Sequence, residues 1–142
     1  MSKSRKIKID KNYKPLPTNE GDEIYSIGIF KFNISKILEH ITFEKLDAQK
    51  EQINVREWFK LHIHGSVNEE HLTMVDTACP VIQGEIRPDM FEIVDGNHRL
   101  EWAYRDGVEW VNSFKLRGEQ LLPYFVDVRG YEAFVEYWNS KL

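Results

Sequence analysis

The sequence predicts a single small α/β domain of the α+β type, in which helices pack on a small mixed sheet. Runs of β-branched and aromatic residues, such as 81–86 and 90–94, are bounded by turn residues, as strands are. Other stretches repeat apolar residues at i, i+3, i+4 and i+7, the spacing of an amphipathic helix. A chain of 142 residues with 42% hydrophobic residues is long enough to bury one core.

The first 21 residues are expected to form a basic flexible tail, and residues 22–142 the folded domain. Residues 1–21 mix Lys, Asn, Pro and Gly with little apolar pattern, and only residues 7–9 suggest a short strand. We predict the first strand of the domain over residues 24–30, which are rich in strand-forming side chains.

A helix is predicted after Asn33, because an Asn side chain accepts hydrogen bonds from the first helical N–H groups. Its apolar stripe is Ile34, Ile37, Leu38 and Ile41. The polar segment 42–52 predicts a surface helix or a loop. Two further helix starts follow, since Asn54 with Glu57 and Ser66 with Glu69 have the spacing of a capping box.

A hairpin is predicted over residues 81–94, with strands at 81–86 and 90–94. Because Pro88 cannot take the positive φ that two-residue hairpin loops prefer, we expect a longer loop, and the register stays undetermined. A helix closed by Gly107, a half-buried strand over 108–116 and a C-terminal helix from about Tyr131 complete the domain.

Charge is unevenly distributed along the chain, which has a formal net charge of -4. Six of the 19 Lys and Arg residues lie in the first 14 positions. Of the 23 Asp and Glu residues, only Asp10 lies there. The remaining 13 basic and 22 acidic residues give the body a charge of -9. Phosphate neutralisation supplies most non-specific affinity for nucleic acid, so a contact with nucleic acid could come only from the N-terminal tail, and we favour the alternative that this tail is simply solvated and disordered.

The composition also restricts the class of protein. One cysteine, Cys79, excludes an internal disulfide and a cysteine-based zinc site. His62, His64 and His71 are separated by a predicted helix, so we expect no metal site built from them. No secretory signal and no apolar run of ~20 residues is seen, and we expect a cytoplasmic protein without a membrane contact.

The stretch from Ile93 to Leu100 is the most informative. A predicted strand ends at Asp95, Gly96 permits a tight turn, and the next residues begin a helix. The first N–H groups of a helix have no intrahelical partner and favour anions, above all phosphate. His98 and Arg99 place positive charge in the first helical turn, where it opposes the helix dipole. This placement indicates a function.

The segments 80–85, 91–100, 107–108 and 111–114, centred on Asp95-Gly96-Asn97-His98-Arg99, resemble the core of the ParB/sulfiredoxin-like superfamily. The resemblance covers roughly residues 80–116. It implies a mixed α/β domain in which a Gly-x-x-Arg or Gly-x-His-Arg turn joins a strand to a helix. Members bind nucleotide phosphates at that turn: sulfiredoxins bind ATP, ParB proteins CTP, and a free-serine kinase branch a nucleotide donor.

Carried over by residue, the resemblance makes Gly96 the turn glycine and places Asn97, His98 and Arg99 at the phosphates. Sulfiredoxins carry their reactive cysteine at the position of Asn97, so sulfinic acid reduction is not expected. ParB proteins have Glu-Arg-Arg after the glycine, where this chain has Asn-His-Arg. The nearest pattern is the Asp-Gly-His-His-Arg of the kinase branch, which differs only at Asn97.

Each candidate residue also has a structural alternative. Arg99 could clamp a phosphate or pair with a carboxylate such as Asp95. His98 could donate to a phosphoryl oxygen or move a proton, or bond a backbone carbonyl. Asp95 could be a catalytic base or a metal contact, or could cap the helix behind it. Glu85 and Glu92 could hold magnesium or divide acid and base roles, or could face solvent.

Three functions follow from this reading. The first is a nucleotide- and phosphate-binding domain that transfers a phosphoryl group from ATP or CTP to a small molecule, with Asp95 or Glu85 as base, His98 as a further catalytic candidate, and magnesium as charge neutraliser. The second is a non-catalytic nucleotide-sensing module whose basic tail contacts nucleic acid. The third, a ParB-like nuclease, is disfavoured by the acidic body. The oligomeric state is not predicted.

Overall fold

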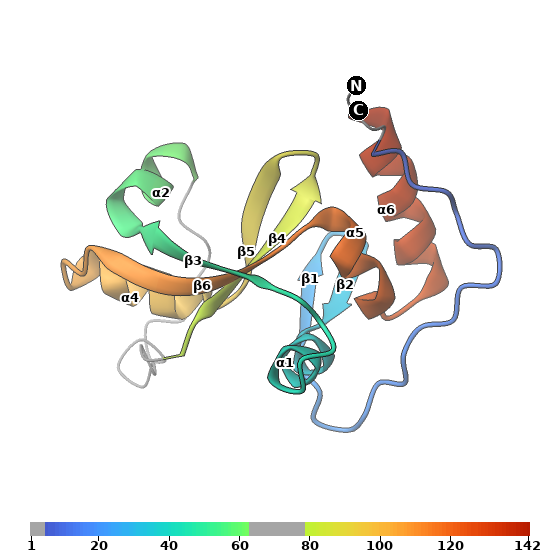
Figure 1. Cartoon of the computed structure of the whole chain (residues 1–142), viewed down its shortest axis with the longest axis horizontal. Coiled ribbons are helices and arrows are strands. Elements are labelled where there is room, and N and C mark those ends of the chain that lie inside the picture. Colours follow the sequence, from blue (N-terminus) through green and yellow to red (C-terminus); the bar gives the residue numbers. More distant parts are fainter. Residues whose placement is uncertain (1–4, 63–78) are drawn as a thin grey trace. The chain divides into compact units, whose positions relative to one another are not determined.

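The structure is a computed structural model that describes residues 5–62 and 79–142 (Figure 1). These ranges contain helices together with a mixed four-stranded sheet and a two-stranded hairpin, which confirms the α/β class. The helix predicted from Ser66 lies outside the described residues, as do His64 and His71. None of the helices in the described ranges has the length and apolarity that crossing a bilayer requires.

The elements are defined as follows. The strands are β1 (Ile24–Ile27), β2 (Phe30–Asn33), β3 (Gln49–Asn54), β4 (Val81–Arg87), β5 (Met90–Asp95) and β6 (Trp110–Leu116). The helices are α1 (Ile34–Thr42), α2 (Val55–Leu61), α4 (Asn97–Arg105), α5 (Gly118–Leu121), the 3-10 helix η1 (Leu122–Tyr124) and α6 (Val128–Ser140).

The chain divides into two compact units. The first takes the described residues of Met1–Asp47, Gly84–Glu92 and Leu116–Leu142, and the second those of Ala48–Gln83 and Ile93–Lys115. Strands β4 and β5 therefore begin in one unit and end in the other.

The single strand predicted over 24–30 is wrong, because the chain reverses within it. β1 and β2 form an antiparallel hairpin in which Ile27 lies opposite Phe30. Gly28 has φ +60°, a left-handed conformation that two-residue hairpin loops favour and glycine adopts without strain. The predicted helix after the hairpin is confirmed, since the Asn33 side chain accepts a hydrogen bond from Lys36 N at 3.0 Å.

Aromatic side chains form the core of the first unit. Phe32 of β2 and Phe134 of α6 are fully buried, and both contact Phe125, with ring centroids 4.6 and 5.1 Å away. Helix α6 begins earlier than predicted because Asp127 caps it, accepting from Gly130 N at 2.6 Å. The short helices α5 and η1 were not predicted, since a turn of this length carries no hydrophobic period.

Residues 5–13, which we call the N-terminal segment, contact α6. Ile7 is buried, and its backbone N–H and C=O both bond the Asn139 side chain, at 2.9 and 2.8 Å. The Tyr13 ring stacks on Tyr131 with centroids 3.8 Å apart, and burial raises the pKa of Tyr13 to about 12. The segment has no strand, so the short strand suggested at 7–9 is wrong.

In the second unit, β3 pairs antiparallel with β6, so the helix or loop predicted over 42–52 is wrong for its second half. The sheet order is β3-β6-β4-β5, which makes β3 an edge strand. Polar side chains are usual on such an edge, and Glu51 there forms an ion pair with Lys115 at 3.1 Å. The polar sequence of β3 is therefore compatible with a strand, although it lacks the apolar pattern by which strands are predicted.

The helix start predicted at Asn54 is confirmed, because its side chain accepts from Glu57 N at 3.0 Å at the beginning of α2. The apolar cluster of this unit joins β3, α2, β4, β5 and α4. Its buried members are Ile53, Val55, Val81, Ile93, Leu100 and Ala103.

The hairpin predicted over 81–94 forms, but its loop is shorter than expected. β4 ends at Arg87 and β5 begins at Met90, which leaves only Pro88 and Asp89 between them. Asp89 takes the positive φ, +64°, so Pro88 keeps its usual conformation. Pro followed by a left-handed residue is the requirement of a type II turn.

Candidate functional site

The strand, turn and helix start predicted around Gly96 are present in the second unit. β5 ends at Asp95, Gly96 is the N-cap residue with φ +100°, and α4 begins at Asn97. The first helical hydrogen bond runs from Leu100 N to Gly96 O at 3.0 Å. No side chain caps this helix, and its first turn holds no acidic residue. The start of α4 is therefore electropositive and is not neutralised from within the helix.

Gly96 cannot be replaced by a larger residue without a clash. A Cβ at this position would lie 2.6 Å from Cγ1 of Val81 and 2.8 Å from Nη2 of Arg99. Its φ of +100° is also unfavourable for residues with a side chain. Because residue 96 is glycine, the backbone of the turn can lie close to β4 and to the Arg99 guanidinium.

Arg99 is held at one end of its guanidinium. Nη2 donates to Asp95 Oδ2 at 3.0 Å and to the Pro80 carbonyl at 3.2 Å. The Nε atom is buried and has no acceptor among the described residues. The side chains of Arg99 and Asp95 are 21% and 11% exposed, so this is a largely buried pair. The alternative in which Arg99 pairs with Asp95 is thus confirmed, and the Nε donor of Arg99 has no acceptor among the described residues.

Asp95 does not cap α4, so the capping alternative is wrong. A cap needs the side-chain oxygen to accept from the first-turn N–H groups, whereas Asp95 turns one oxygen, Oδ2, to Arg99. Its other oxygen has no hydrogen bond within the described part of the chain. The roles of base or metal contact remain predictions.

Asn97 and His98 complete the first turn, and both are half-buried. The Asn97 side chain donates a long hydrogen bond, 3.4 Å, to the Ile93 carbonyl, which turns its amide back toward β5. The backbone N–H groups of Asn97, His98 and Arg99 are the ones that a helix start leaves without an intrahelical acceptor. Three such groups beside a guanidinium make an arrangement that suits a phosphate.

A cavity of about 380 Å³ lies in the same unit. Pro80, whose carbonyl accepts from Arg99, forms part of its wall, and the paired strands β3 and β6 supply the rest. Gln52 and Asn112 face each other across these strands and are hydrogen-bonded at 3.2 Å, and Phe114 offers a half-buried ring. Amide groups beside an aromatic ring are typical of pockets that bind small organic ligands.

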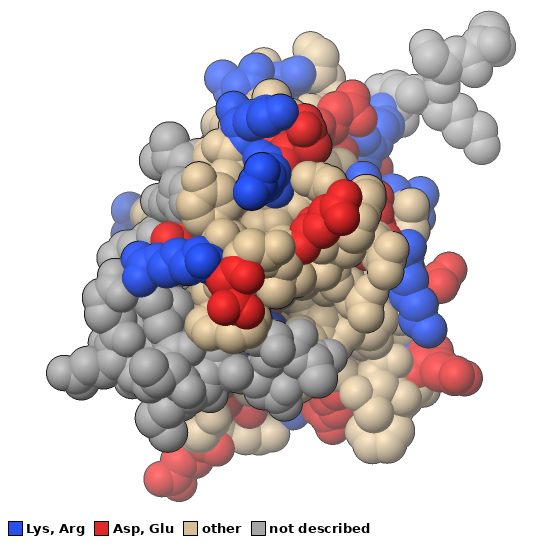
Figure 2. Space-filling model, turned by 90° about the vertical axis from the view of Figure 1, so that its left-hand side faces the viewer, with Lys and Arg blue, Asp and Glu red and all other residues tan. Residues whose placement is uncertain are grey.

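Charges of both signs are mixed on the molecular face shown in Figure 2. Among the described residues, Lys and Arg side chains lie beside Asp and Glu side chains, and these residues form no continuous area of one sign on this face. Binding of duplex nucleic acid depends on an extended basic surface. The described residues of this face therefore do not have the charge pattern of a nucleic-acid interface.

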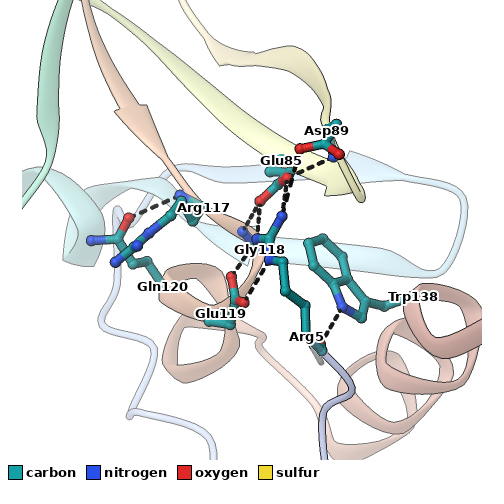
Figure 3. Close-up of polar contacts among 8 residues, drawn as sticks. All are labelled: Arg5, Glu85, Asp89, Arg117, Gly118, Glu119, Gln120 and Trp138. Atoms are coloured by element: carbon teal, nitrogen blue, oxygen red, sulfur yellow. Dashed lines mark hydrogen bonds and ion pairs between the residues drawn. The ribbon is translucent and has the colours of Figure 1, made fainter. Parts of the chain in front are cut away.

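Glu85 lies in the first unit, on β4, and is only 1% exposed (Figure 3). Its Oε1 accepts from Arg5 Nη2 at 2.7 Å and from Gly118 N at 2.9 Å. Its Oε2 accepts from Arg5 Nη1 at 2.9 Å and from Asp89 N at 2.7 Å. A carboxylate has about four acceptor positions, and all four are filled. This favours a structural role over the predicted roles of base or metal ligand.

The protonation of Glu85 is set by opposing effects. Burial penalises the charged form and would raise its pKa, but the hydrogen bonds from Arg5, Gly118 and Asp89 outweigh burial and lower the pKa of Glu85. Sequence reasoning placed Arg5 in a basic tail and missed this pairing. The available signal was a lone acidic residue in an apolar strand, which needs a cationic partner if it is buried.

Glu92 was considered together with Glu85. It is half-buried on β5, and its charge adds to burial in raising the pKa of Tyr25. Within residues 5–62 and 79–142, no three His, Cys, Asp or Glu side chains gather as a cation site.

Replacing Gly96 by Ala should destabilise the protein through both strain and collision with Val81. We expect the free energy of unfolding in urea to fall by about 2–4 kcal/mol. Gly107→Ala is the matched control, because Gly107 also has positive φ, +74°, but has open space around it. That control should cost about 1 kcal/mol. Equal losses for the two variants would show that the close approach at Gly96 is unimportant.

The low pKa of Glu85 predicts a loss of stability in acid. Because the folded pKa lies below the unfolded value, the stabilisation is complete above about pH 5 and disappears as the pH falls through the folded pKa. Urea unfolding measured at several pH values between about 6 and 3 should show this slope. In Glu85→Gln the slope should be smaller, and an unchanged slope would contradict the assignment.

Comparison of the chain with protein-family models, with curated proteins and with solved structures finds no match.

Proposed function

We propose that the Gly96 turn binds the phosphate groups of a nucleotide, ATP or CTP, and that the domain belongs to the ParB/sulfiredoxin-like superfamily which its sequence resembles. One observation carries the proposal. Helix α4 begins at a glycine with no side-chain cap and no acid in its first turn, and that turn carries Arg99. Such a helix end is stabilised by an anion.

The orientation of Arg99 supports this proposal. Asp95 and the Pro80 carbonyl fix one nitrogen of the guanidinium, so the side chain loses little conformational freedom when a ligand binds. The Nε atom, buried without an acceptor among the described residues, is a donor that a phosphate oxygen would satisfy. The negative charge of Asp95 also keeps the site from being strongly basic when it is empty.

The cavity next to Pro80 supports a ligand larger than inorganic phosphate. Its volume of about 380 Å³ lies at the lower end of the range for small-molecule pockets. Phe114 and the amides of Gln52 and Asn112 offer an aromatic surface and hydrogen-bonding groups to a base or sugar. A nucleotide combines these features with a phosphate, and ATP and CTP differ in the base that these groups would contact.

Phosphoryl transfer to a small molecule is the second candidate. It is favoured by Asp95, because Arg99 orients one carboxylate oxygen and the other has no described partner. That oxygen could accept the proton of a substrate hydroxyl, while His98 and Arg99 would stabilise the transferred group; a magnesium ion bound with the nucleotide would supply charge neutralisation. Glu85 is left out of this mechanism, since all its acceptor positions are filled.

The proposed binding site is tested by Arg99→Ala in the intact chain. Loss of charge-assisted hydrogen bonds worth roughly 1.5–3 kcal/mol each should weaken ATP or CTP binding tenfold or more, measured by calorimetry. Arg105→Ala is the matched control on the same helix. Arg105 lies in the last turn of α4, paired with Glu101, and its removal should leave affinity unchanged. Equal effects of the two variants would contradict the site.

The two candidate functions are separated by Asp95→Asn. If Asp95 is the base, transfer of the terminal phosphate from ATP or CTP to small hydroxyl compounds should fall by ~10² or more while nucleotide affinity changes less. A binding module shows no turnover above the protein-free background even in the wild type. Transfer that survives Asp95→Asn would exclude this residue as base.

A further inference from the structure

A second built site lies in the first unit, around the guanidinium of Arg5 (Figure 3). Glu85 binds one edge of the group through Nη1 and Nη2, at 2.9 and 2.7 Å. Glu119 binds the neighbouring edge through Nε and Nη2, at 3.1 and 2.7 Å. Both edges of the planar group are therefore matched by a carboxylate, each with two hydrogen bonds.

Trp138 completes the site. Its ring lies 4.8 Å from the guanidinium carbon, the geometry of a cation–π contact, and its indole N–H donates to the Arg5 carbonyl at 2.9 Å. The ring is fully buried, so its position is set by the core. Asp89 lies 3.8 Å from Nη1 and adds negative charge at the rim.

This geometry selects a guanidinium among cations. Two carboxylates on adjacent edges and a ring on the face match a flat group with five donors in a fixed fork, whereas an ammonium is a compact point charge. Burial lowers the pKa of Arg5, but the hydrogen bonds from its guanidinium to Glu85 and Glu119 outweigh burial, and the net shift is upward. Burial raises the pKa of both acids, but the hydrogen bonds and charge of Arg5, together with backbone N–H donors, outweigh burial and lower the pKa of both.

The residues that surround the guanidinium and the residue that carries it come from different kinds of structure. Glu85, Glu119 and Trp138 stand on β4, α5 and α6, which are regular elements of the unit. Arg5 belongs to the N-terminal segment, which has no helix or strand and also contacts α6 through Ile7, Asp10 and Tyr13. The buried acid Glu85 thus lies on a regular strand, while the positive charge that pairs with it comes from the irregular N-terminal segment.

We propose that Glu85, Glu119 and Trp138 form a binding site for an alkylguanidinium, the head group of an arginine side chain, and that Arg5 is its occupant in cis. The N-terminal segment then acts as a strap that is held in place by ligand-like recognition at Arg5. This inference does not rest on the nucleotide site at Gly96.

The test uses the full-length Arg5→Ala protein and follows thermal unfolding at neutral pH. Removing the guanidinium leaves a buried carboxylate without its partner, so the melting temperature should fall by about 10 °C. Methylguanidinium is then added as the probe, with methylammonium at equal concentration as the matched control. At ten times its dissociation constant methylguanidinium should raise the melting temperature by about 4 °C, and above that concentration the rise should continue with the logarithm of the concentration.

Two further proteins make the result specific. The wild type, whose site is filled, should not respond, and neither should Arg5→Ala/Glu85→Gln, whose site keeps Glu119 but lacks the buried carboxylate of Glu85. If Arg5→Ala does not fold alone, the same two cations are compared by the yield of refolded protein. An equal response to methylguanidinium and methylammonium, or no response to either, would overturn the proposal.

Discussion

The buried carboxylate of Glu85 is the constraint on which the first unit depends. A charge with 1% exposure is tolerated only where its lone pairs are filled, and here four donors converge on it. Two come from Arg5, one from the β4–β5 turn at Asp89 and one from the start of α5 at Gly118. A single side chain thus ties together the N-terminal segment, the hairpin turn and the C-terminal helices, and it stays ionised because each of them donates to it.

The second unit has a different constraint, which concerns positive charge: the electropositive start of α4. Where β5 passes into α4, the first N–H groups have no acceptor within the helix, and the chain adds Arg99 where an acid would have been more stable. Asp95 partly compensates that charge through its bond to Arg99. Gly96 makes the arrangement possible, because only a residue without a side chain fits between Val81 and the guanidinium. An unneutralised helix start in a well-packed unit is what supports phosphate binding as the proposed function.

Prediction succeeded where the signal is local. Asn33 and Asn54 cap the helices that their side chains predicted, and the strand–turn–helix around Gly96 lies where the pattern placed it. It failed where the deciding contact is distant. β3 is polar because it is the edge of a sheet, and its partner β6 is about 60 residues away in the chain. The reversal at Gly28 was missed because residues 24–30 are strand-forming throughout and the glycine alone marks the turn.

The α/β class, the helix caps at Asn33 and Asn54 and the strand–turn–helix at Gly96 could be predicted from the sequence, since each depends on local patterns of residues. Only the tertiary structure decided which charges meet. Arg5 reaches Glu85 across 80 positions and Glu119 across 114, and no local pattern encodes such pairs. It also decided that Asp95 binds Arg99 instead of capping α4, because both arrangements satisfy the same carboxylate and side-chain packing chooses between them.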